Sequence, residues 1–398
     1  MSKAPKCPVT ADWQPYDPAF RKDPFPVYER FRRECPVGWV DAFDGFWAVS
    51  RYEDVFRVAL DPETFCSSEG IAIPPMEYDG RALPMASDPP EHTALRSILA
   101  RELSRDAVAA REPMLRHCAR RLLKEISEAG SADFSERYAK LLPTNVICRL
   151  LDIEGDEAQL RDLQAWTEEI VYERRDAASA RRASDSIVAF FDEIIPRRRA
   201  HPGSDFISTL LAAEVDGKPL GDREIMDFCW FLLIAGLDNT AFTIRNLLLQ
   251  IGASDSLRER LVREPARIAD AVEEVLRLYS PVWGIARTAT RDTEIDGQPI
   301  AAGERVMMLF ASADRDEAKF PEPDRFVLGR KPNVHVAFGV GKHRCLGTHL
   351  ARLEIRVAVE EVLRHLPDYR VVGEVGWNGM GPLPVTYTPK TINLEATA

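Results

Sequence analysis

One decapeptide decides the fold of this 398-residue chain: Phe338-Gly339-Val340-Gly341-Lys342-His343-Arg344-Cys345-Leu346-Gly347. Its glycines allow a tight backbone turn, and the amphipathic stretch at about residues 348–366 predicts a helix directly after it. The amino end of that helix would point N–H groups and a positive dipole at the Cys345 sulfur, which favours the thiolate. An anionic sulfur on a rigid turn is typical of the proximal ligand of a haem iron. A buried structural cysteine is the alternative, and the whole decapeptide disfavours it.

This decapeptide resembles the haem-binding loop of the cytochrome P450 monooxygenases, and the resemblance runs from about residue 17 to about residue 387. It implies a mainly α fold with small β-sheets, an α+β triangular prism in which a long central helix crosses the haem. It implies one domain over residues 1–398, of which 1–16 form a flexible amino end. The implied cofactor is haem b, with the Cys345 thiolate as axial ligand and with Phe338, Gly339 and Gly347 beside the porphyrin.

Composition narrows the class of protein and its compartment. The net charge of −11 argues against general binding to nucleic acid. The seven cysteines are scattered, without a C-x-x-C pair or zinc spacing, which favours a reducing cytoplasm. The amino end has no apolar core of signal-peptide length. The apolar run at 228–237 is shorter than the roughly 20 residues of a spanning helix, so we expect a soluble cytoplasmic protein without a membrane partner.

Helical periodicity dominates the chain, and one helix stands out. Residues 222–251 predict a helix of roughly 45 Å whose middle is apolar on all sides and therefore buried. Residues 69–87, by contrast, are broken by glycine and proline and predict a long loop. Long loops in compact enzymes are often functional.

The middle of the long helix reads Ala235-Gly236-Leu237-Asp238-Asn239-Thr240. A buried carboxylate without a visible partner is costly, and glycine in mid-helix costs about 1 kcal/mol relative to alanine. A core aspartate and a helix-packing glycine are one explanation. Beside the Cys345 motif we favour another, in which Ala235 and Gly236 leave space for O2 or substrate over the haem and Asp238 relays protons.

At the next position the chain departs from the family. Most members have threonine directly after the acid, whereas this chain has Asn239. Thr240 lies about 100° further around the helix and cannot take the same place. Some terpene-oxidising members, such as the bacterial cineole hydroxylase, are similar in having asparagine there. An amide can hold water or bond a polar oxygen, so we hypothesise that Asn239 orients an oxygen-bearing substrate or an ordered water.

Two further sets of charged residues match family positions. Glu274 and Arg277 share one helical face, and the resemblance implies a structural network completed by a third basic residue, Arg325, with Arg330 as the alternative. Taken alone, such a pair is usually a weak surface bridge. Haem propionates require basic partners, and the family positions fall on His92, Arg96, Arg287 and His343. Each of these alone could be an ordinary surface cation.

The resemblance also places a substrate pocket around residues 70–87, 166–175, 232–240, 281–285 and 380–383. Its mostly apolar candidates suit a small hydrophobic substrate, although core packing explains each of them nearly as well. The candidates are Ile71, Ile73, Met76, Leu83, Leu233, Leu237, Val282, Trp283 and Leu383.

The implied function is a monooxygenase that activates O2 and hydroxylates, O-demethylates or epoxidises a small hydrophobic molecule. A terpenoid or small aromatic fits best, and fatty acids and steroids stay open. Electrons would come from a ferredoxin or flavodoxin with its NAD(P)H reductase, docking at Lys342, Arg344 and Arg352. The alternatives are a peroxygenase driven by H2O2 and a non-catalytic haem-binding partner protein.

Overall fold

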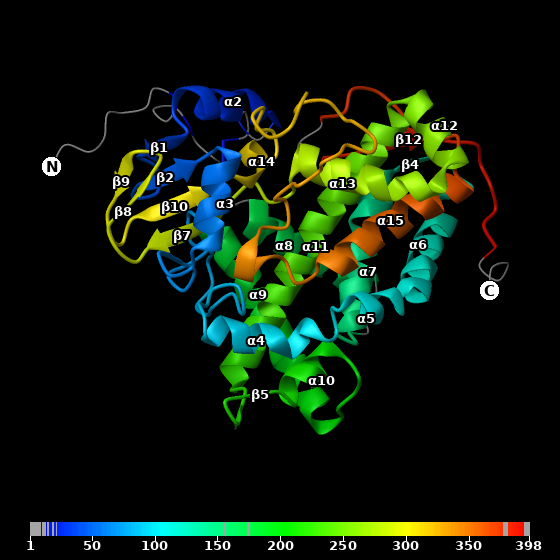
Figure 1. Ribbon diagram of the computed structural model, residues 1–398. Helices are drawn as coiled ribbons and strands as arrows, with labels where there is room; N and C mark the ends of the chain where they lie inside the picture. Colours follow the sequence, from blue (N-terminus) through cyan, green and yellow to red (C-terminus); the bar gives the residue numbers. More distant parts are fainter. Residues whose placement is uncertain are drawn as a thin grey trace.

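The computed structural model describes residues 9, 13, 16–17, 20, 22–153, 157–172, 176–376 and 381–393. The amino end predicted to be flexible, residues 1–16, lies largely outside the described residues. Figure 1 shows a roughly triangular molecule with a small β-rich part on one side and a larger helical part on the other. The predicted mainly α architecture with small sheets is confirmed.

The β-rich part is built on a five-stranded sheet with the order β1-β2-β10-β7-β3. The central strands β2 and β10 run parallel, with Val306 opposite Trp47, and the other neighbours are antiparallel. Helices α2 and α3 belong to this part (Figure 1). The bounds are β1 Val37–Val40, β2 Phe46–Val49, β3 Phe65–Cys66, β7 Ile285–Ala289, β10 Arg305–Met308, α2 Phe25–Glu34 and α3 Tyr52–Leu60.

The helical part contains the remaining long elements. Its helices are α4 Glu91–Ala100, α5 Arg105–Ala109, α6 Glu112–Ile126, α7 Leu141–Leu150, α8 Glu157–Tyr172, α9 Ala177–Ala200, α10 Phe206–Leu211, α11 Asp222–Gly252, α12 Asp255–Arg263, α13 Ile268–Tyr279, α14 Phe310–Ala313 and α15 Thr348–His365, with a π-helical turn at Ser135–Ala139 and 3-10 turns at Pro265–Arg267 and Gly341–His343. Two small sheets complete it: β11-β12-β4 (Arg370–Val371, Pro384–Thr386, Ser131–Asp133) and β5-β6 (Glu214–Val215, Lys218–Pro219). The hairpin β8-β9 (Thr293–Ile295, Gln298–Ile300) lies beside the five-stranded sheet in the β-rich part (Figure 1).

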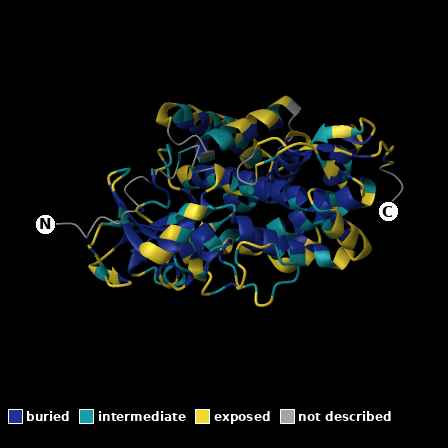
Figure 2. Ribbon diagram, turned by 90° about the horizontal axis from the view of Figure 1, so that it is seen from above, coloured by how far each residue is buried: buried dark blue, intermediate teal, exposed yellow. Residues whose placement is uncertain are grey.

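Helix α11 is the predicted central helix, and it is continuous over 31 residues. Its start is fixed by the Gly221 N–H, which donates to the Glu224 carboxylate at 2.8 Å. Leu233 and Leu237 are fully buried, and Figure 2 shows buried residues concentrated across the middle of the molecule. Among the described residues, α11 is the one helix long and apolar enough to cross a membrane, and 72% of its most apolar window is buried inside the protein. The protein core accounts for its apolar character.

Six of the seven cysteines lie among the described residues, and five of them have free thiols whereas one is disulfide-bonded. Cys66, Cys118, Cys148 and Cys229 are free and buried, and Cys345 is free and exposed. Cys35 is disulfide-bonded, which the scattered cysteine pattern did not predict.

Helices α6 and α15 are joined by a buried ion-pair network. The fully buried Glu361 carboxylate receives Arg116 at 2.7 Å and Arg120 at 2.9 Å. Burial acts to raise the pKa of Glu361, but the His365 imidazole 3.4 Å away and hydrogen bonds from Arg120 and Arg116 outweigh it and lower that pKa to about 2. Because the folded pKa is depressed, the network stabilises the fold above the unfolded value of 4.5 and is lost as the pH falls toward 2.

We expect Glu361→Gln to lower the free energy of unfolding by about 3 kcal/mol at pH 7, because two arginines lose their buried partner. Urea denaturation at pH 7 and pH 3 measures the difference, which should shrink at the lower pH. Glu264→Gln, in the exposed Arg260–Glu264 pair, is the control and should change little. A difference that stays the same at both pH values would contradict the account.

Candidate active site

The Cys345 loop has the tight turns that its glycines predict. Gly339 and Gly341 adopt φ of +65° and +70°, the left-handed region that favours glycine. A Cβ on Gly341 would lie 3.0 Å from the Ala59 carbonyl oxygen of α3, so the loop packs closely against that helix. The Cys345 N–H donates to the Phe338 carbonyl at 2.8 Å, which closes the loop. Helix α15 begins three residues after the cysteine, as predicted.

The Cys345 sulfur faces an internal cavity. The residue is exposed yet lines the cavity and is surrounded by protein, so its open surface is directed inward. Burial raises the pKa of the Cys345 thiol, whereas the Gly347 N–H, the Arg96 guanidinium and the Thr348 hydroxyl act to lower it. The Gly347 N–H at the start of α15 thus favours the thiolate, as predicted from the sequence, although burial outweighs it in the protein without haem. A metal cation bound to the sulfur would stabilise its deprotonated form, the thiolate.

Helix α11 forms another wall of the cavity. Ala235 is exposed and Gly236 partly exposed in the middle of this otherwise buried helix, and both line the cavity. A Cβ on Gly236 would lie 3.3 Å from Ile147 Cδ1, so the glycine also lets α7 pack closely. The α11 residues on this face are Phe231, Leu232, Ala235, Gly236, Asn239, Thr240 and Thr243.

The four basic residues predicted for the propionates meet at this cavity. His92 and Arg96 come from α4, Arg287 from β7 and His343 from the Cys345 loop, and all four line it. The two imidazole rings lie 4.0 Å apart between centroids, and His343 Nε2 lies 3.2 Å from the Ser67 hydroxyl. Three elements that are distant in the sequence thus bring these four side chains together, and we call them the basic cluster.

This basic cluster fits two carboxylates. Burial lowers the pKa of His92 to about 4, of His343 to about 3 and of Arg287 to about 10. The Nδ1 atoms of both histidines have no hydrogen-bond partner among the described residues, and none of the four basic groups has a carboxylate of the described chain at salt-bridge distance. Two desolvated guanidinium groups and two neutral imidazoles thus lie at the edge of an apolar cavity with a cysteine sulfur in its wall. They match a porphyrin with two propionates, because guanidinium neutralises a carboxylate and a neutral imidazole donates a hydrogen bond to it. The residues present therefore fit haem.

Asp238 and Asn239, the acid and the amide in the middle of α11, lie on different sides of the helix. Asp238 is fully buried and faces α8, with Oδ1 3.5 Å from the Thr167 hydroxyl and Oδ2 unpartnered. Burial and the nearby Glu168 carboxylate raise the pKa of Asp238, and Lys140 acts against them. Asn239 instead lines the cavity. The residue after the acid, rather than the acid itself, therefore meets the cavity.

Thr240 also lines the cavity, and so does Thr243, which the sequence analysis did not single out. The Thr243 hydroxyl donates to the Asn239 carbonyl at 2.8 Å. Thr243 lies four residues after Asn239, on the same helix face. This spacing in the sequence could have predicted that Thr243 lines the cavity.

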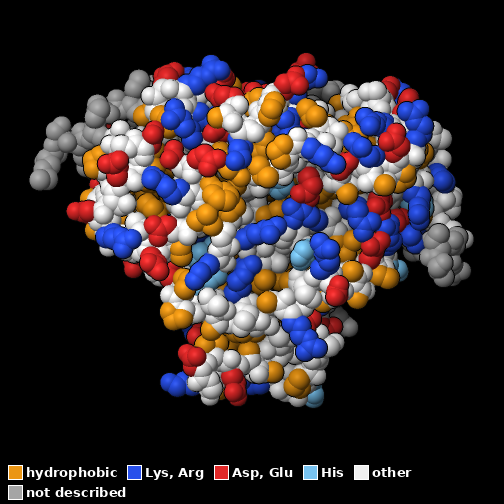
Figure 3. Space-filling model, viewed as in Figure 1, with side chains coloured by type: hydrophobic (Ala, Val, Ile, Leu, Met, Phe, Trp, Pro, Cys, Tyr) orange, Lys and Arg blue, Asp and Glu red, His pale blue; other side chains and the backbone are white. Residues whose placement is uncertain are grey.

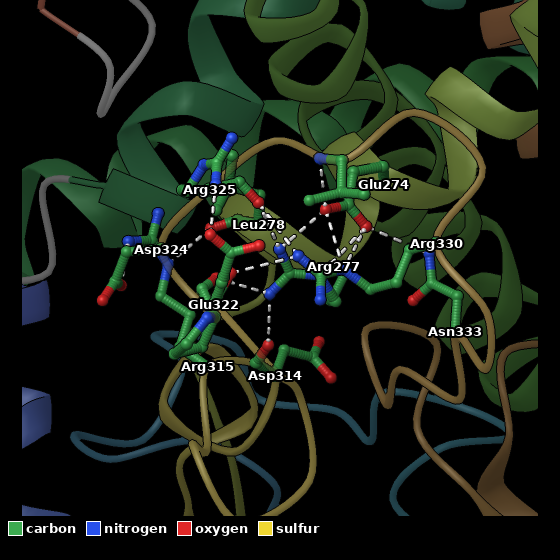
Figure 4. A network of polar contacts seen from close by, with 12 residues as sticks. Glu274, Arg277, Leu278, Asp314, Arg315, Glu322, Asp324, Arg325, Arg330 and Asn333 are labelled. Atoms are coloured by element: carbon green, nitrogen blue, oxygen red, sulfur yellow. Dashed lines mark hydrogen bonds and ion pairs between the residues drawn. The ribbon is translucent and has the colours of Figure 1, made fainter.

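Glu274 and Arg277 form the predicted buried pair on α13 (Figure 4). Arg277 donates to both Glu274 oxygens at 3.1 and 2.9 Å, and both side chains are fully buried. The third basic residue is Arg330, whose Nε lies 3.0 and 3.1 Å from the two Glu274 oxygens.

The prediction of Arg325 for this third position is corrected. The Arg325 side chain is 70% exposed and pairs with Glu322, and only its backbone carbonyl reaches the network, accepting from Arg277 at 3.2 Å. The physical reason is a turn: the Val327 N–H donates to Glu274, and the Arg330 N–H donates to the Val327 carbonyl. This turn brings Arg330 beneath the Glu274 carboxylate.

Of the nine predicted substrate-pocket residues, Val282 alone is among the described residues that line the cavity. Leu83, Leu233, Leu237 and Leu383 are buried in the main hydrophobic core, and Ile71 and Met76 pack against it. Ile73 belongs to a second core cluster beside Trp13 and Phe31. Trp283 packs against Tyr16 and Phe20. Residues 173–175 and 380 of the predicted pocket lie outside the described residues.

The residues that do line the distal part of the cavity are neighbours of the predicted ones. Leu233 and Leu237 fall on the core side of α11, whereas Phe231, Leu232 and Ala235 face the cavity, as the helical period requires. Outside α11, Pro84, Met85, Ile147, Pro281, Ile285 and Met308 are among the lining residues.

Comparison with known proteins agrees with this geometry. The cytochrome P450 family model matches residues 38–367. The steroid C26-monooxygenase of Mycobacterium tuberculosis is 34% identical over 363 residues, covering 87% of this chain and 96% of that protein.

Two solved structures resemble the whole fold. CYP109E1 from Bacillus megaterium, in complex with testosterone, superposes with a TM-score of 0.84 at 31% identity, covering 93% of this chain and 99% of that one. CYP268A2 of Mycobacterium marinum, in complex with pseudoionone, gives a TM-score of 0.83 at 32% identity over 95% and 100% of the two chains. The chain therefore belongs to the cytochrome P450 family of haem-thiolate monooxygenases.

Proposed function

We propose that this chain takes two electrons from a separate redox protein and inserts one oxygen atom of O2 into a small hydrophobic substrate. One observation supports this most: the Cys345 sulfur and the small-residue face of α11 line one cavity. Haem bound through a cysteine thiolate supplies the activation of O2 once electrons and protons arrive.

The proposed haem contacts follow from the cavity lining. Cys345 would ligate the iron, and the small residues Ala235 and Gly236 would leave room for O2 or substrate on the α11 side of the cavity. Arg96 and Arg287 would neutralise the propionates, and His92 and His343, whose pKa values burial lowers, would donate hydrogen bonds to them as neutral imidazoles. Phe338, Gly339 and Gly347 lie on the same cavity wall as the cysteine.

The proposed substrate is a terpenoid or a small aromatic molecule. The distal lining is mostly apolar and includes Met85, Phe231, Leu232, Val282 and Ile285, which suits a ligand with few polar groups. The relative with pseudoionone bound supports the terpenoid class. The relative with testosterone bound brings steroids into the test panel as well.

The proposed electron donor is a small acidic ferredoxin or flavodoxin that docks beside the Cys345 loop in the cytoplasm. Lys342 and Arg344 are exposed there, and Figure 3 shows lysine and arginine side chains gathered across the middle of this face. Arg352 contributes less than predicted, because Glu273 neutralises it at 2.5 and 2.7 Å. An acidic partner complements the remaining charge.

The decisive experiment for the function compares electron sources. Purified holoprotein is screened with terpenoids, aromatics and steroids for a low-spin to high-spin shift, and each binder is then assayed with a ferredoxin, its reductase, NADH and O2. We expect oxidised product that carries one 18O atom from 18O2. Catalase is added to this set, and a second set contains H2O2 alone, so that the two sets distinguish the electron-driven reaction from the peroxygenase alternative. Turnover with H2O2 only would overturn the proposed electron route, and binding without product in either set would favour a non-catalytic role.

Asn239 is proposed to hold a water or a substrate oxygen over the haem, since its side chain faces the cavity and Thr243 bonds its carbonyl. We expect Asn239→Ala to lower product formed per NADH several-fold or to shift the site of oxidation. Leu233→Val, a core change on the same helix, is the control and should leave both unchanged. Unaltered coupling and regiochemistry in Asn239→Ala would refute this role.

The Glu274–Arg277–Arg330 network is proposed to hold the proximal side for haem incorporation. We expect Arg330→Ala to lower stability by about 3 kcal/mol, because it removes a partner of a buried carboxylate, and to lower haem content per polypeptide. Arg325→Ala, at an exposed side chain, should behave like the wild type. Urea midpoints and the ratio of haem to protein absorbance report both effects, and equal losses in the two variants would contradict the assignment.

A further inference from the structure

Buried carboxyl groups in the described chain are nearly all paired. Glu274 receives Arg277 and Arg330, Glu361 receives Arg116 and Arg120, and the Asp227 carboxylate receives Tyr78 at 2.7 Å and Arg223 at 3.1 Å. Two exceptions have an oxygen with no hydrogen-bond partner: Asp238 Oδ2 and Glu354 Oε1. They belong to α11 and α15, two helices that line the haem cavity. Asp238 was predicted from the sequence to relay protons, whereas Glu354 has no role in the proposed function.

Glu354 is held in an apolar part of the cavity wall. It lies on α15, nine residues after Cys345, and is 3% exposed. It lines the cavity together with Leu350, Ala351 and Ile355 of the same helix. An unpaired buried carboxylate is strongly disfavoured, so such a group takes up a proton instead. Burial accordingly raises the pKa of Glu354 to about 8.

Charged groups of α15 and of three other helices that line the cavity interact with groups other than Glu354. On α15, Arg352 binds Glu273 and Arg356 binds Glu112 and Glu360. On α4, Arg96 acts on Cys345, and on α13 Glu274 is bound by Arg277. On α11, Asp238 faces α8.

On α6, the Cys118 thiol is the titratable group that senses Glu354. Burial raises the pKa of Cys118, Arg149 and Arg121 act against it, and Glu354 raises it further. Arg121 itself donates to Asn145. No basic group of the described residues lies at salt-bridge distance from Glu354.

We propose that Glu354 carries a proton at neutral pH and that losing this proton makes the haem iron harder to reduce. A second negative charge in the wall of a cavity that already holds a thiolate would oppose the arrival of an electron, because the interior screens charge poorly. Where Glu354 is ionised in the oxidised protein, reduction draws up to one proton per electron from solvent onto its carboxylate. Glu354 thus acts through charge on the electron-transfer step and touches no reacting atom.

The test is a spectroelectrochemical titration of the substrate-free holoprotein between pH 6 and 9.5. For the wild type we expect a reduction potential that is level at low pH and falls as Glu354 ionises, with a slope of at most about 59 mV per pH unit, one proton per electron. Glu354→Gln removes the ionisation and should give a level potential over the same range. Glu360→Gln, an ion-paired carboxylate on the same helix, is the matched control and should keep the wild-type slope.

Each outcome decides the proposal. A level wild-type potential, or a slope that persists in Glu354→Gln, overturns it, and the second result assigns the proton to another group such as a propionate. If Glu354→Gln does not bind haem, Glu354→Asp decides, because it keeps an ionisable group at a changed depth. A slope displaced along the pH axis then supports the proposal, and a slope at the wild-type position contradicts it.

Discussion

The sulfur of Cys345, held in the wall of an apolar cavity, is the constraint on which the rest of the structure depends. Burial raises the pKa of the Cys345 thiol, although the Gly347 N–H, the Thr348 hydroxyl and the charge of Arg96 act to lower it. The loop around it is nevertheless fixed, with Gly339 and Gly341 in left-handed conformations and Gly341 close against α3. The protein therefore prepares the position of the sulfur, and the metal that binds it supplies the charge that makes the thiolate stable.

The same balance of charge and burial recurs around the cavity. Arg96 and Arg287 face it desolvated and without a described carboxylate partner, and the neutral His92 and His343 each keep an Nδ1 atom without a described hydrogen-bond partner. The protein without haem therefore lacks a counter-charge for two guanidinium groups and partners for two imidazoles. Glu274 illustrates the opposite solution, because two arginines, a backbone N–H and Asn333 surround its carboxylate. Unpaired basic residues suit a ligand-binding site, whereas the fully paired Glu274 carboxylate suits a structural network.

Much of this architecture could be predicted from local sequence patterns. The Cys345 loop and the long central helix were predicted correctly, because each depends on a short contiguous sequence pattern. The family resemblance assigned His92, Arg96, Arg287 and His343 to one site, and the structure brings them to one cavity; their role toward the propionates stays a prediction. The choice between Arg325 and Arg330 failed because a turn between Val327 and Arg330, invisible in the sequence, decides which guanidinium reaches Glu274. The pocket residues failed for a related reason: Leu233 and Phe231 are equally apolar, and only packing determines which side of α11 meets the cavity.

The central claim is an iron–sulfur bond at residue 345, and the spectrum of the reduced, carbon-monoxide-treated holoprotein tests it most directly. A thiolate ligand predicts a Soret band near about 450 nm, and Cys345→His, which keeps a ligating side chain, should move that band to shorter wavelength while haem is retained. A wild-type protein that binds haem but lacks the long-wavelength band, or a variant that keeps it, would contradict the account.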